Sequence, residues 1–409
     1  MKNADQLICS LCWDKQHIDV GEMVRHNKEI FFKYYPDFLD LNLEISPFKL
    51  PLSEEILQPD TLVFDGLFGI FDDSLPDGWG RLLLDRTLVS KGRNLNEVTP
   101  LDRLSIVGSN GLGALCYRPV SIATDQVLED ISLDQIANAS QQILSGTSNE
   151  MIEQLFLRGG SSGGARPKIF VGYHPEKDLL RPYQQRLPKD FEHWIIKFPA
   201  NADPHDIAQI EYAYYLMAME AGLQMSDCHL FTGMSGRKYF GTKRFDRIGN
   251  RRLHLHSASG LMHDNFRLSS MDYGHLMDAA FRLENDVRAY EKVFRLAAFN
   301  IYSNNRDDHS KNFAFLMNPS GEWQMAPAFD LTFSTSSHGQ HSTTVAGEGK
   351  SPGESQLLEL AHLFGIDQAV NIIRQVKDVT NEWKYFANQA GVTKNSTKWI
   401  NDHLTALPD

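Results

Sequence analysis

Residues 304–312, with the sequence NNRDDHSKN, gather polar side chains of several kinds between two apolar runs. Asp307 and Asn312 are five residues apart, and Asp330 follows Asn312 by 18 residues. Phosphoryl transfer from a nucleotide needs a carboxylate that orients the attacking hydroxyl, a group that holds Mg²⁺ beside the phosphates, and a further carboxylate that bridges this metal. The observed spacing offers all three groups from one loop and the end of one strand.

A surface loop with incidental charge is the alternative interpretation of this segment, because turns rich in Asn and Asp are common. The apolar runs on both sides count against it, since a solvated loop has little reason to lie between two core segments. His309 stands where such loops often carry a residue that steadies the phosphates, and Lys311 is a further catalytic candidate. The spacing to Asn312 favours Asp307 over Asp308 as the base, and we expect Asp308 to support it.

A single lysine, Lys197, lies in the apolar stretch HWIIKFP, which reads as a strand over residues 193–199. Strand alternation places it on the same face as Ile195. A buried, unpaired lysine costs several kcal/mol, so we expect an anionic partner, either a nucleotide phosphate or Glu211 on the helix predicted to follow. A strand-end lysine that reaches out to water is the alternative interpretation.

The segment RGGSSGGARPK, residues 158–168, contains four glycines ahead of a predicted strand. Glycine allows backbone N–H groups to approach phosphate oxygens closely, and Arg166 and Lys168 add positive charge. The segment fits neither GxxxxGK[ST] nor GxGxxG. A flexible linker is the alternative, and the firm apolar pattern of KIFVGYH, directly after the glycines, counts against it.

The elements that must position these groups follow one order along the chain. Short strand-like runs and helical patterns occupy residues 1 to about 120, a helix is expected over about 128–146, and a strong helical pattern covers 207–222. From about residue 260 onward the pattern is mainly helical, interrupted by a polar stretch at 334–355. A strand-rich part followed by a helical part is the layout of kinases, which hold nucleotide between two lobes.

We therefore predict an α+β protein with a two-lobed, protein-kinase-like fold and an all-helical C-terminal lobe. The expected divisions are an N-terminal subdomain at residues 1–122, a nucleotide-binding lobe at 123–255 and a helical lobe at 256–409. The glycine loop, strand lysine, helix glutamate, D-x-x-x-x-N motif and final aspartate follow in the order that a kinase requires. This order is stronger evidence than any one of the motifs alone.

Composition limits the classes of function. The 409 residues are 42% hydrophobic and carry a formal net charge of −12, which suits a folded protein and argues against one that coats nucleic acid unaided. We expect no secretory signal, because the N-terminal residues have no long apolar core, and no membrane span, because no window approaches about 18 uninterrupted apolar residues. A cytoplasmic location fits these features and the count of four cysteines.

Two of these cysteines, Cys9 and Cys12, form a CxxC motif, which suggests half a zinc site or a redox pair. No second CxxC or nearby Cys/His pair completes a set of four ligands. The stretch LICSLCW also reads as a strand, in which positions i and i+3 face opposite sides. We expect a structural strand here rather than a metal or redox site.

Over nearly its whole length the sequence resembles the HipA-type serine/threonine kinases, the toxin halves of bacterial toxin–antitoxin pairs. The segments that carry the resemblance in the N-terminal part are VGEM, FKYYPDFL, DSLPDGWGR and PLDRLSIVGSNGLGAL. Further along they are GGARPK, HWIIKFP, IEYAYYLMAMEAGL, KRFDR, DDHSKNFAF and PAFDLT. Several of these segments are specific, and their order makes the likeness strong.

The resemblance implies ATP and Mg²⁺ as cofactors and Asp307 as the catalytic base. It implies Asn312 and Asp330 as metal ligands. Lys197, paired with Glu211, would contact the ATP phosphates. The other residues implied to contact the nucleotide are Gly163, Gly164, Ala165, Arg166, Lys168, Lys243, Phe245 and Asp246.

Within the hinge implied at Lys243–Asp246, the backbone would read adenine and Asp246 would lie near the ribose. The hinge reads KRFDR, where the resemblance leads us to expect an acidic residue at Lys243, so recognition of adenine by that side chain departs from the family pattern. Ser161 or Ser162 occupies the position of a regulatory serine in the glycine loop. A phosphate there adds about −1.5 to −2 charge, which would repel the ATP phosphates and favour an inactive loop.

The resemblance also implies partners: a small, HipB-like helix-turn-helix antitoxin, contact with DNA only through it, and a protein substrate such as an aminoacyl-tRNA synthetase. The D-x-H-x-x-N order also occurs in phosphatidylinositol kinases, so a lipid or small-molecule kinase of the same architecture is the second hypothesis. A catalytically silent module that docks an antitoxin is the third. The residues whose joint retention disfavours silence are Lys197, Asp307, Asn312 and Asp330.

Overall fold

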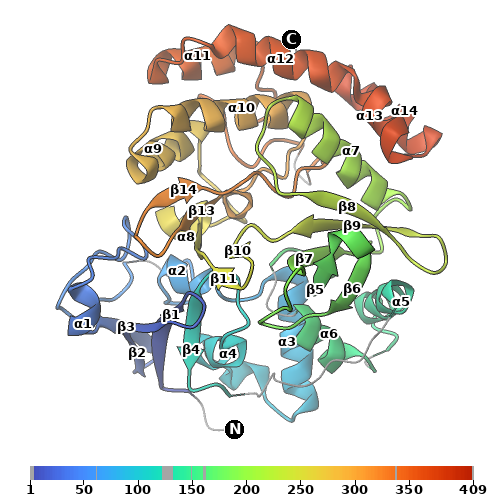
Figure 1. Ribbon diagram of the computed structural model, residues 1–409. Helices are drawn as coiled ribbons and strands as arrows, with labels where there is room; N and C mark the ends of the chain where they lie inside the picture. The colour runs from blue at the N-terminus through green and yellow to red at the C-terminus, as the bar shows by residue number, and fades with distance from the viewer. Residues whose placement is uncertain are drawn as a thin grey trace.

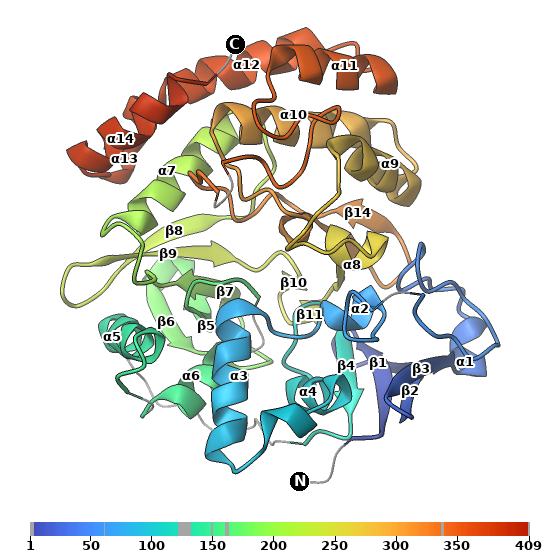
Figure 2. The same cartoon turned by 180° about the vertical axis from the view of Figure 1, so that it is seen from behind.

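The computed structural model describes residues 4–60, 62–121, 132–148, 150–159, 163–336 and 339–407. In Figure 1 the sheet near the N-terminus and the sheet in the middle of the chain lie apart, and the C-terminal helices lie at the end of the molecule away from the N-terminus. Seen from behind in Figure 2, helix α3 (Gly78–Ser90) stands between the elements of the two sheets. The chain thus has a strand-rich side and a helical side.

An antiparallel sheet of four strands opens the chain, with the strand order β3-β2-β1-β4. Its strands are β1 (Gln6–Cys12), β2 (His17–His26), β3 (Glu29–Tyr34) and β4 (Leu115–Arg118). Alternate side chains of β3, those of Ile30, Phe32 and Tyr34, are buried, which is the period of two that a half-covered strand requires. The short helices connecting this sheet are α1 (Pro36–Leu39), α2 (Gly69–Asp72) and α4 (Pro100–Val107).

The second sheet has five strands in the order β6-β5-β7-β9-β8, all paired antiparallel. Its strands are β5 (Lys168–His174), β6 (Leu179–Pro182), β7 (Glu192–Lys197), β8 (Cys228–Thr232) and β9 (Lys238–Lys243). The helices of this part are α5 (Leu133–Leu144), α6 (Ile152–Gly159) and α7 (Ile207–Glu220). Trp79 and Leu83 of α3 share one core with Ile169 and Ile196, so this helix ties the N-terminal part to the second sheet.

The C-terminal lobe is mainly helical, as predicted. Its helices are α8 (Ala258–Met262), α9 (Tyr273–Glu284), α10 (Arg288–Tyr302), α11 (Glu354–Phe364), α12 (Ala369–Asn381), α13 (Trp383–Ala390) and α14 (Lys394–Leu404). In Figure 1, α12 and α13 form an outer layer over α10 and α7. These helices bury one large apolar core together with α7.

A small sheet corrects the prediction of an all-helical C-terminal lobe. Its strands are β12 (His254–Ser257), β13 (Ala314–Met317) and β14 (Trp323–Met325), and the two-residue strands β10 (Arg247–Ile248) and β11 (Arg251–Arg252) precede it. All four residues of β13 are buried, so this short run shows no alternation that would distinguish a strand from a buried helical turn. The sheet matters because β13 directly follows residues 304–312.

The CxxC motif lies on β1, as predicted. A β-bulge between Cys9 and Ser10 interrupts the alternation, and both Cys9 and Cys12 are buried. Within the described residues, no group of three or more His, Cys, Asp or Glu side chains is placed to hold a metal ion. In the same part of the chain, no helix has the length and hydropathy needed to cross a bilayer.

Candidate active site

A cavity of about 450 Å³ collects side chains from all three parts of the chain. The second sheet and α7 contribute Lys168, Ile195, Lys197, Glu211, Phe240 and Thr242. The C-terminal lobe contributes Asp307, His309, Lys311, Asn312 and Asp330, and the N-terminal part contributes Asp73, Leu75, Asp77 and Gly78. Residues distant in sequence and singled out by their chemistry therefore meet at one site.

Asp307 lies in the loop that follows α10. Its side chain is 58% exposed and lies 3.8 Å from His309, measured from Oδ1 to Nε2. Partial desolvation raises the pKa of Asp307 above its usual value, with Asp330 adding to the effect and His309 opposing it. Asn312 donates a hydrogen bond of 2.7 Å from Nδ2 to the Asp307 carbonyl, which closes the loop on itself. The carboxylate is left accessible from the cavity.

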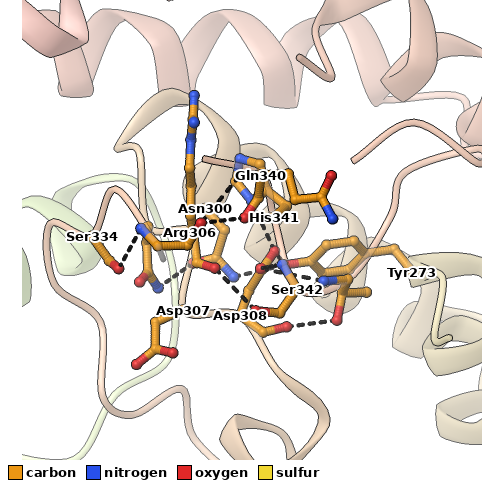
Figure 3. Close-up of polar contacts among 12 residues, drawn as sticks. Tyr273, Asn300, Arg306, Asp307, Asp308, Ser334, Gln340, His341 and Ser342 are labelled. Atoms are coloured by element: carbon orange, nitrogen blue, oxygen red, sulfur yellow. Dashed lines mark hydrogen bonds and ion pairs between the residues drawn. The ribbon is translucent and has the colours of Figure 1, made fainter. Parts of the chain in front are cut away.

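Asp308 points the other way and is buried, as Figure 3 shows. Its Oδ2 accepts a hydrogen bond from the Tyr273 hydroxyl over 3.0 Å and lies 3.0 Å from His341 Nδ1. Its Oδ1 accepts a hydrogen bond of 2.8 Å from the Ser342 N–H. The second aspartate therefore fastens the loop to α9 and to residues 341–343, which is the supporting role expected of it.

Two of these anchoring residues, Tyr273 and His341, were not identified from the sequence. Asn300 Nδ2 donates to the Tyr273 hydroxyl over 2.7 Å, and Asn305 Nδ2 donates to Asn300 Oδ1 over 2.9 Å. The three asparagine and tyrosine side chains are buried between α9 and α10. The signal available in the sequence was Asn300 in the apolar run of α10, a polar group that needs hydrogen-bonding partners when it is buried.

Lys197 connects the second sheet to the C-terminal lobe. Its Nζ lies 2.9 Å from Glu211 Oε2, the partner that the sequence predicts, and 2.5 Å from Asp330 Oδ1. Burial alone would lower the pKa of Lys197, but Asp330 and Glu211 raise it, so the side chain stays charged. Lys197, Glu211 and Asp330 thus form one largely buried ion-pair network. The alternative, in which this lysine extends from the strand end into water, is wrong.

Asp330 has the features of a metal-binding aspartate. Its φ is +58°, in the left-handed region that non-glycine residues occupy mainly at strained or functional positions. Burial raises the pKa of Asp330, but Lys197 and Lys168 lower it overall, so the carboxylate is ionised. Among the described residues, none donates a hydrogen bond to its second oxygen, Oδ2.

The residues present fit Mg²⁺ bound together with phosphate. Asn312 and Asp330 offer the oxygen ligands that Mg²⁺ prefers, and both line the cavity. Magnesium in nucleotide sites is held by one or two protein groups together with phosphate oxygens and water.

Arg166 is placed differently from the prediction. It donates from Nε and Nη2 to Asp203 over 3.0 Å each, and from Nη1 to Glu211 over 3.0 Å. Burial alone would lower the pKa of Arg166, but Glu211 and Asp203 raise it. Its charge therefore orients Glu211, and its side chain is not among those that line the cavity. The expectation that this charge faces phosphate is corrected.

Lys168 remains at the cavity, directly opposite Lys197 in the β5–β7 register. Its Nζ donates to the Gly163 carbonyl over 2.5 Å. Burial lowers the pKa of Lys168. Gly163, Gly164 and Ala165 line the cavity beside it, which keeps the glycine loop a candidate for phosphate contact. Ser161 and Ser162 lie outside the described residues.

Asp246 lines the cavity, but its carboxylate is bonded within the protein. This side chain is buried, and both of its oxygens accept hydrogen bonds from Arg244, of 2.9 Å and 2.8 Å. Oδ2 also accepts from Arg247 over 2.6 Å and from the Gly113 N–H over 2.8 Å. These bonds hold the hinge to the N-terminal part, and the contact of Asp246 with a ribose stays a prediction.

Some backbone N–H groups of the hinge are also hydrogen-bonded within the protein. The N–H groups of Lys243 and Arg244 donate to the carbonyls of Asp227 and His193 over 2.9 Å and 2.8 Å. Within the described part of the chain, no acceptor is bonded to the N–H of Phe245, which lines the cavity. That N–H is therefore a backbone donor of the hinge segment that faces the cavity lining without an acceptor in the described residues.

Replacement of Lys243 by alanine is expected to change the affinity for ATP by less than about threefold. The side chain is paired with Glu192 over 2.6 Å, and partly exposed ion pairs of this kind contribute little. Calorimetric titration of ATP measures the effect, with Lys238→Ala as the matched control, because Lys238 lies on the same strand and bonds to Thr232. A tenfold or larger loss confined to Lys243→Ala would mean that this side chain reads the base after all.

The chain matches known proteins both in family and in fold. The model of the HipA-like C-terminal domain matches residues 160–383, and that of the HipA N-terminal domain matches residues 13–118. No curated protein matches the chain.

Among solved structures, the HipA, HipB and operator DNA complex of the toxin–antitoxin system of Shewanella oneidensis MR-1 is similar, with a TM-score of 0.66 and 16% identity over 98% of this chain and 95% of that one. This likeness confirms the predicted two-lobed α+β fold. The proinflammatory kinase CtkA of Helicobacter pylori aligns with a TM-score of 0.33 and 16% identity, over 54% of this chain and 92% of that one.

Proposed function

The chain belongs to the HipA family, and on that basis we propose that it is a Mg²⁺·ATP-dependent serine/threonine protein kinase that acts as the toxin of a toxin–antitoxin pair. One observation carries the proposal. A single cavity is lined by the Lys197–Glu211 ion pair, by Asp307, and by Asn312 and Asp330. These are the groups that phosphoryl transfer from a nucleotide requires.

Each group has a distinct role in the proposed reaction. Lys197, held by Glu211, orients the ATP phosphates, and Asn312 and Asp330 hold the metal. Mg²⁺, when bound, offsets the negative charge of the phosphates. Asp307 orients the acceptor hydroxyl and accepts its proton, a task that suits a carboxylate with a raised pKa near the cavity.

The rest of the cavity suits a nucleoside. Ile195, Met225, Phe240 and Phe329 supply apolar surface for a base, and such pockets are mostly apolar with a few placed polar groups. The Phe245 N–H is the donor available to adenine at the hinge. Asp246 has no part in this contact, because its carboxylate is bonded within the protein.

The acceptor and partners are part of the proposal. We expect phosphorylation of a translation component such as an aminoacyl-tRNA synthetase, and autophosphorylation at Ser161 or Ser162. A HipB-like antitoxin is the expected partner, supported by the similar HipA structure, which contains HipB and operator DNA. The formal net charge of −12 suits contact with DNA through that partner rather than directly.

Asp330→Asn is expected to abolish the dependence of ATP binding on Mg²⁺. The substitution keeps the shape of the side chain but removes the charge that a divalent ion requires. Titrations of ATP with Mg²⁺ and with a chelator, on the wild-type protein and on the variant, measure the effect. The metal should strengthen binding only in the wild type; equal strengthening in both would remove Asp330 from the metal site.

A further inference from the structure

The turn that leads into α3 holds the glycine loop by its backbone. Asp77 Oδ1 accepts a hydrogen bond from the Gly164 N–H, and the Trp79 N–H donates to the Gly164 carbonyl over 3.0 Å. Gly78 lies between them with φ of +44°, and a Cβ atom at this position would be 2.5 Å from the Gly164 carbonyl oxygen. The turn therefore holds both peptide groups of Gly164 and requires glycine at position 78.

The second oxygen of Asp77 reaches the catalytic loop. Oδ2 lies 3.2 Å from Lys311 Nζ, which is also 3.4 Å from Asp72 Oδ2. Lys311 therefore lies between two carboxylates, those of Asp72 and Asp77. One carboxylate thus joins the glycine loop to a lysine of the catalytic loop.

Asp77 makes these contacts in place of a local one. It occupies the N-cap position of α3, where an aspartate ordinarily accepts a hydrogen bond from an N–H group of its own helix. No such capping bond is formed here. Asp77 therefore departs from the usual capping pattern and bonds to residues distant in sequence instead. Departures from such local rules are expected mainly at functional sites.

The turn itself is fixed to the C-terminal lobe. Asp73 Oδ2 accepts a hydrogen bond from the Ser257 N–H over 2.7 Å and lies 2.7 Å from His256 Nδ1. Helix α2 packs so closely on α8 that a Cβ atom at Gly69 would lie 2.2 Å from the Gly260 carbonyl oxygen. Asp77 is therefore presented to the cavity from a rigid support.

We propose that Asp77 is a positioning residue for phosphate transfer: one oxygen keeps the glycine loop over the cavity, and the other sets Lys311 beside the phosphates. The inference rests on the proposed kinase function. It also makes the N-terminal part of the chain a third wall of the active site, joined to both lobes. The two oxygens have separable effects, which a pair of substitutions distinguishes.

Asp77→Ala removes both contacts. Without nucleotide, the Gly164 amide of this variant is expected to exchange its hydrogen about tenfold faster than in the wild type, the effect of losing one hydrogen bond to a charged group. The KM for ATP should rise about tenfold as well, because the loop is no longer held over the cavity. Hydrogen exchange followed by mass spectrometry and steady-state kinetics measure these two changes in the full-length protein.

Asp77→Asn separates the two roles. Its amide oxygen still accepts from the Gly164 N–H, so the protection of this amide and the KM should stay near wild type. Its amide nitrogen faces the charged Lys311, so kcat should fall about tenfold, as expected when one charge-assisted contact is lost. Asp72→Asn is the matched control, because it removes the other carboxylate beside Lys311 without touching Gly164, and it should leave the exchange of Gly164 unchanged.

These experiments distinguish a failure of the positioning role of Asp77 from a failure of the kinase proposal. Equal exchange of Gly164 in the wild type and in Asp77→Ala would overturn the positioning role. An equal rise of KM in the alanine and asparagine variants would overturn it as well. A wild-type protein that transfers no phosphate would refute the kinase proposal instead, while the exchange of Gly164 would still decide whether Asp77 holds the loop. Thermal unfolding identifies a variant that has lost its fold, and Asp77→Asn then carries the test, because it is isosteric.

Discussion

Asp307→Asn is expected to lower the turnover of phosphate transfer by about 10²- to 10⁴-fold, the usual contribution of a positioned general base. The affinity for Mg²⁺·ATP should change little, because the side chain is not a predicted metal ligand and is 58% exposed at the cavity. Transfer of labelled phosphate from ATP measures the first quantity, and calorimetric titration measures the second.

The neighbouring aspartate provides the matched control. Asp308→Asn removes the same charge one residue away, but Asp308 is buried and bonded to Tyr273 and Ser342. We expect this variant to lose stability, whereas Asp307→Asn should unfold at the wild-type temperature.

In cells, expression of the wild type should arrest growth, and expression of Asp307→Asn should not. Full activity in Asp307→Asn would exclude it as the base, and a harmless active enzyme would count against a toxin.

Asp246→Asn is expected to destabilise the protein by about 3–5 kcal/mol, the cost of leaving buried charges without their partner. Arg244 and Arg247 are 1% and 4% exposed in their side chains, and both depend on this carboxylate. Arg244 also lies over the Phe170 ring at 4.4 Å, so it cannot turn toward water without losing packing. Urea unfolding of the nucleotide-free protein measures the change.

Asp227→Asn is the control for this substitution. Asp227 pairs with Lys243 over 3.6 Å, but its side chain is 74% exposed, so its removal should cost less than about 1 kcal/mol. If Asp246→Asn were as mild as this control while weakening ATP binding, the predicted ribose contact would be supported instead. The two variants therefore distinguish a structural carboxylate from a ligand-binding one.

The parts of the site that could be predicted depend on short-range patterns. Asp307 and Asn312 come from one loop, so their spacing fixes their relation before the fold is known. The Lys197–Glu211 pair follows from a strand and a helix that are adjacent in sequence, where an apolar strand with one charge requires a nearby partner. The helical lobe follows from its periodicity.

The parts that could not be predicted depend on contacts between distant segments. Asp77 and Lys311 are 234 residues apart, and Asp246 and Gly113 are 133 apart, yet each pair is bonded. No periodicity records which of many carboxylates an arginine or lysine will meet. Arg166 shows the same difficulty: its position beside a glycine loop suggested phosphate contact, and the fold supplies Asp203 and Glu211 instead.

The most direct test of a kinase at this cavity is phosphate transfer from γ-labelled ATP to protein, with Mg²⁺, followed by identification of the labelled amino acid. We predict label on serine or threonine of proteins in a bacterial extract with the wild type, no label when Mg²⁺ is chelated, and none with Asp307→Asn. Label found only on lipid or small molecules, or no transfer by wild-type protein that remains folded, would contradict a protein serine/threonine kinase.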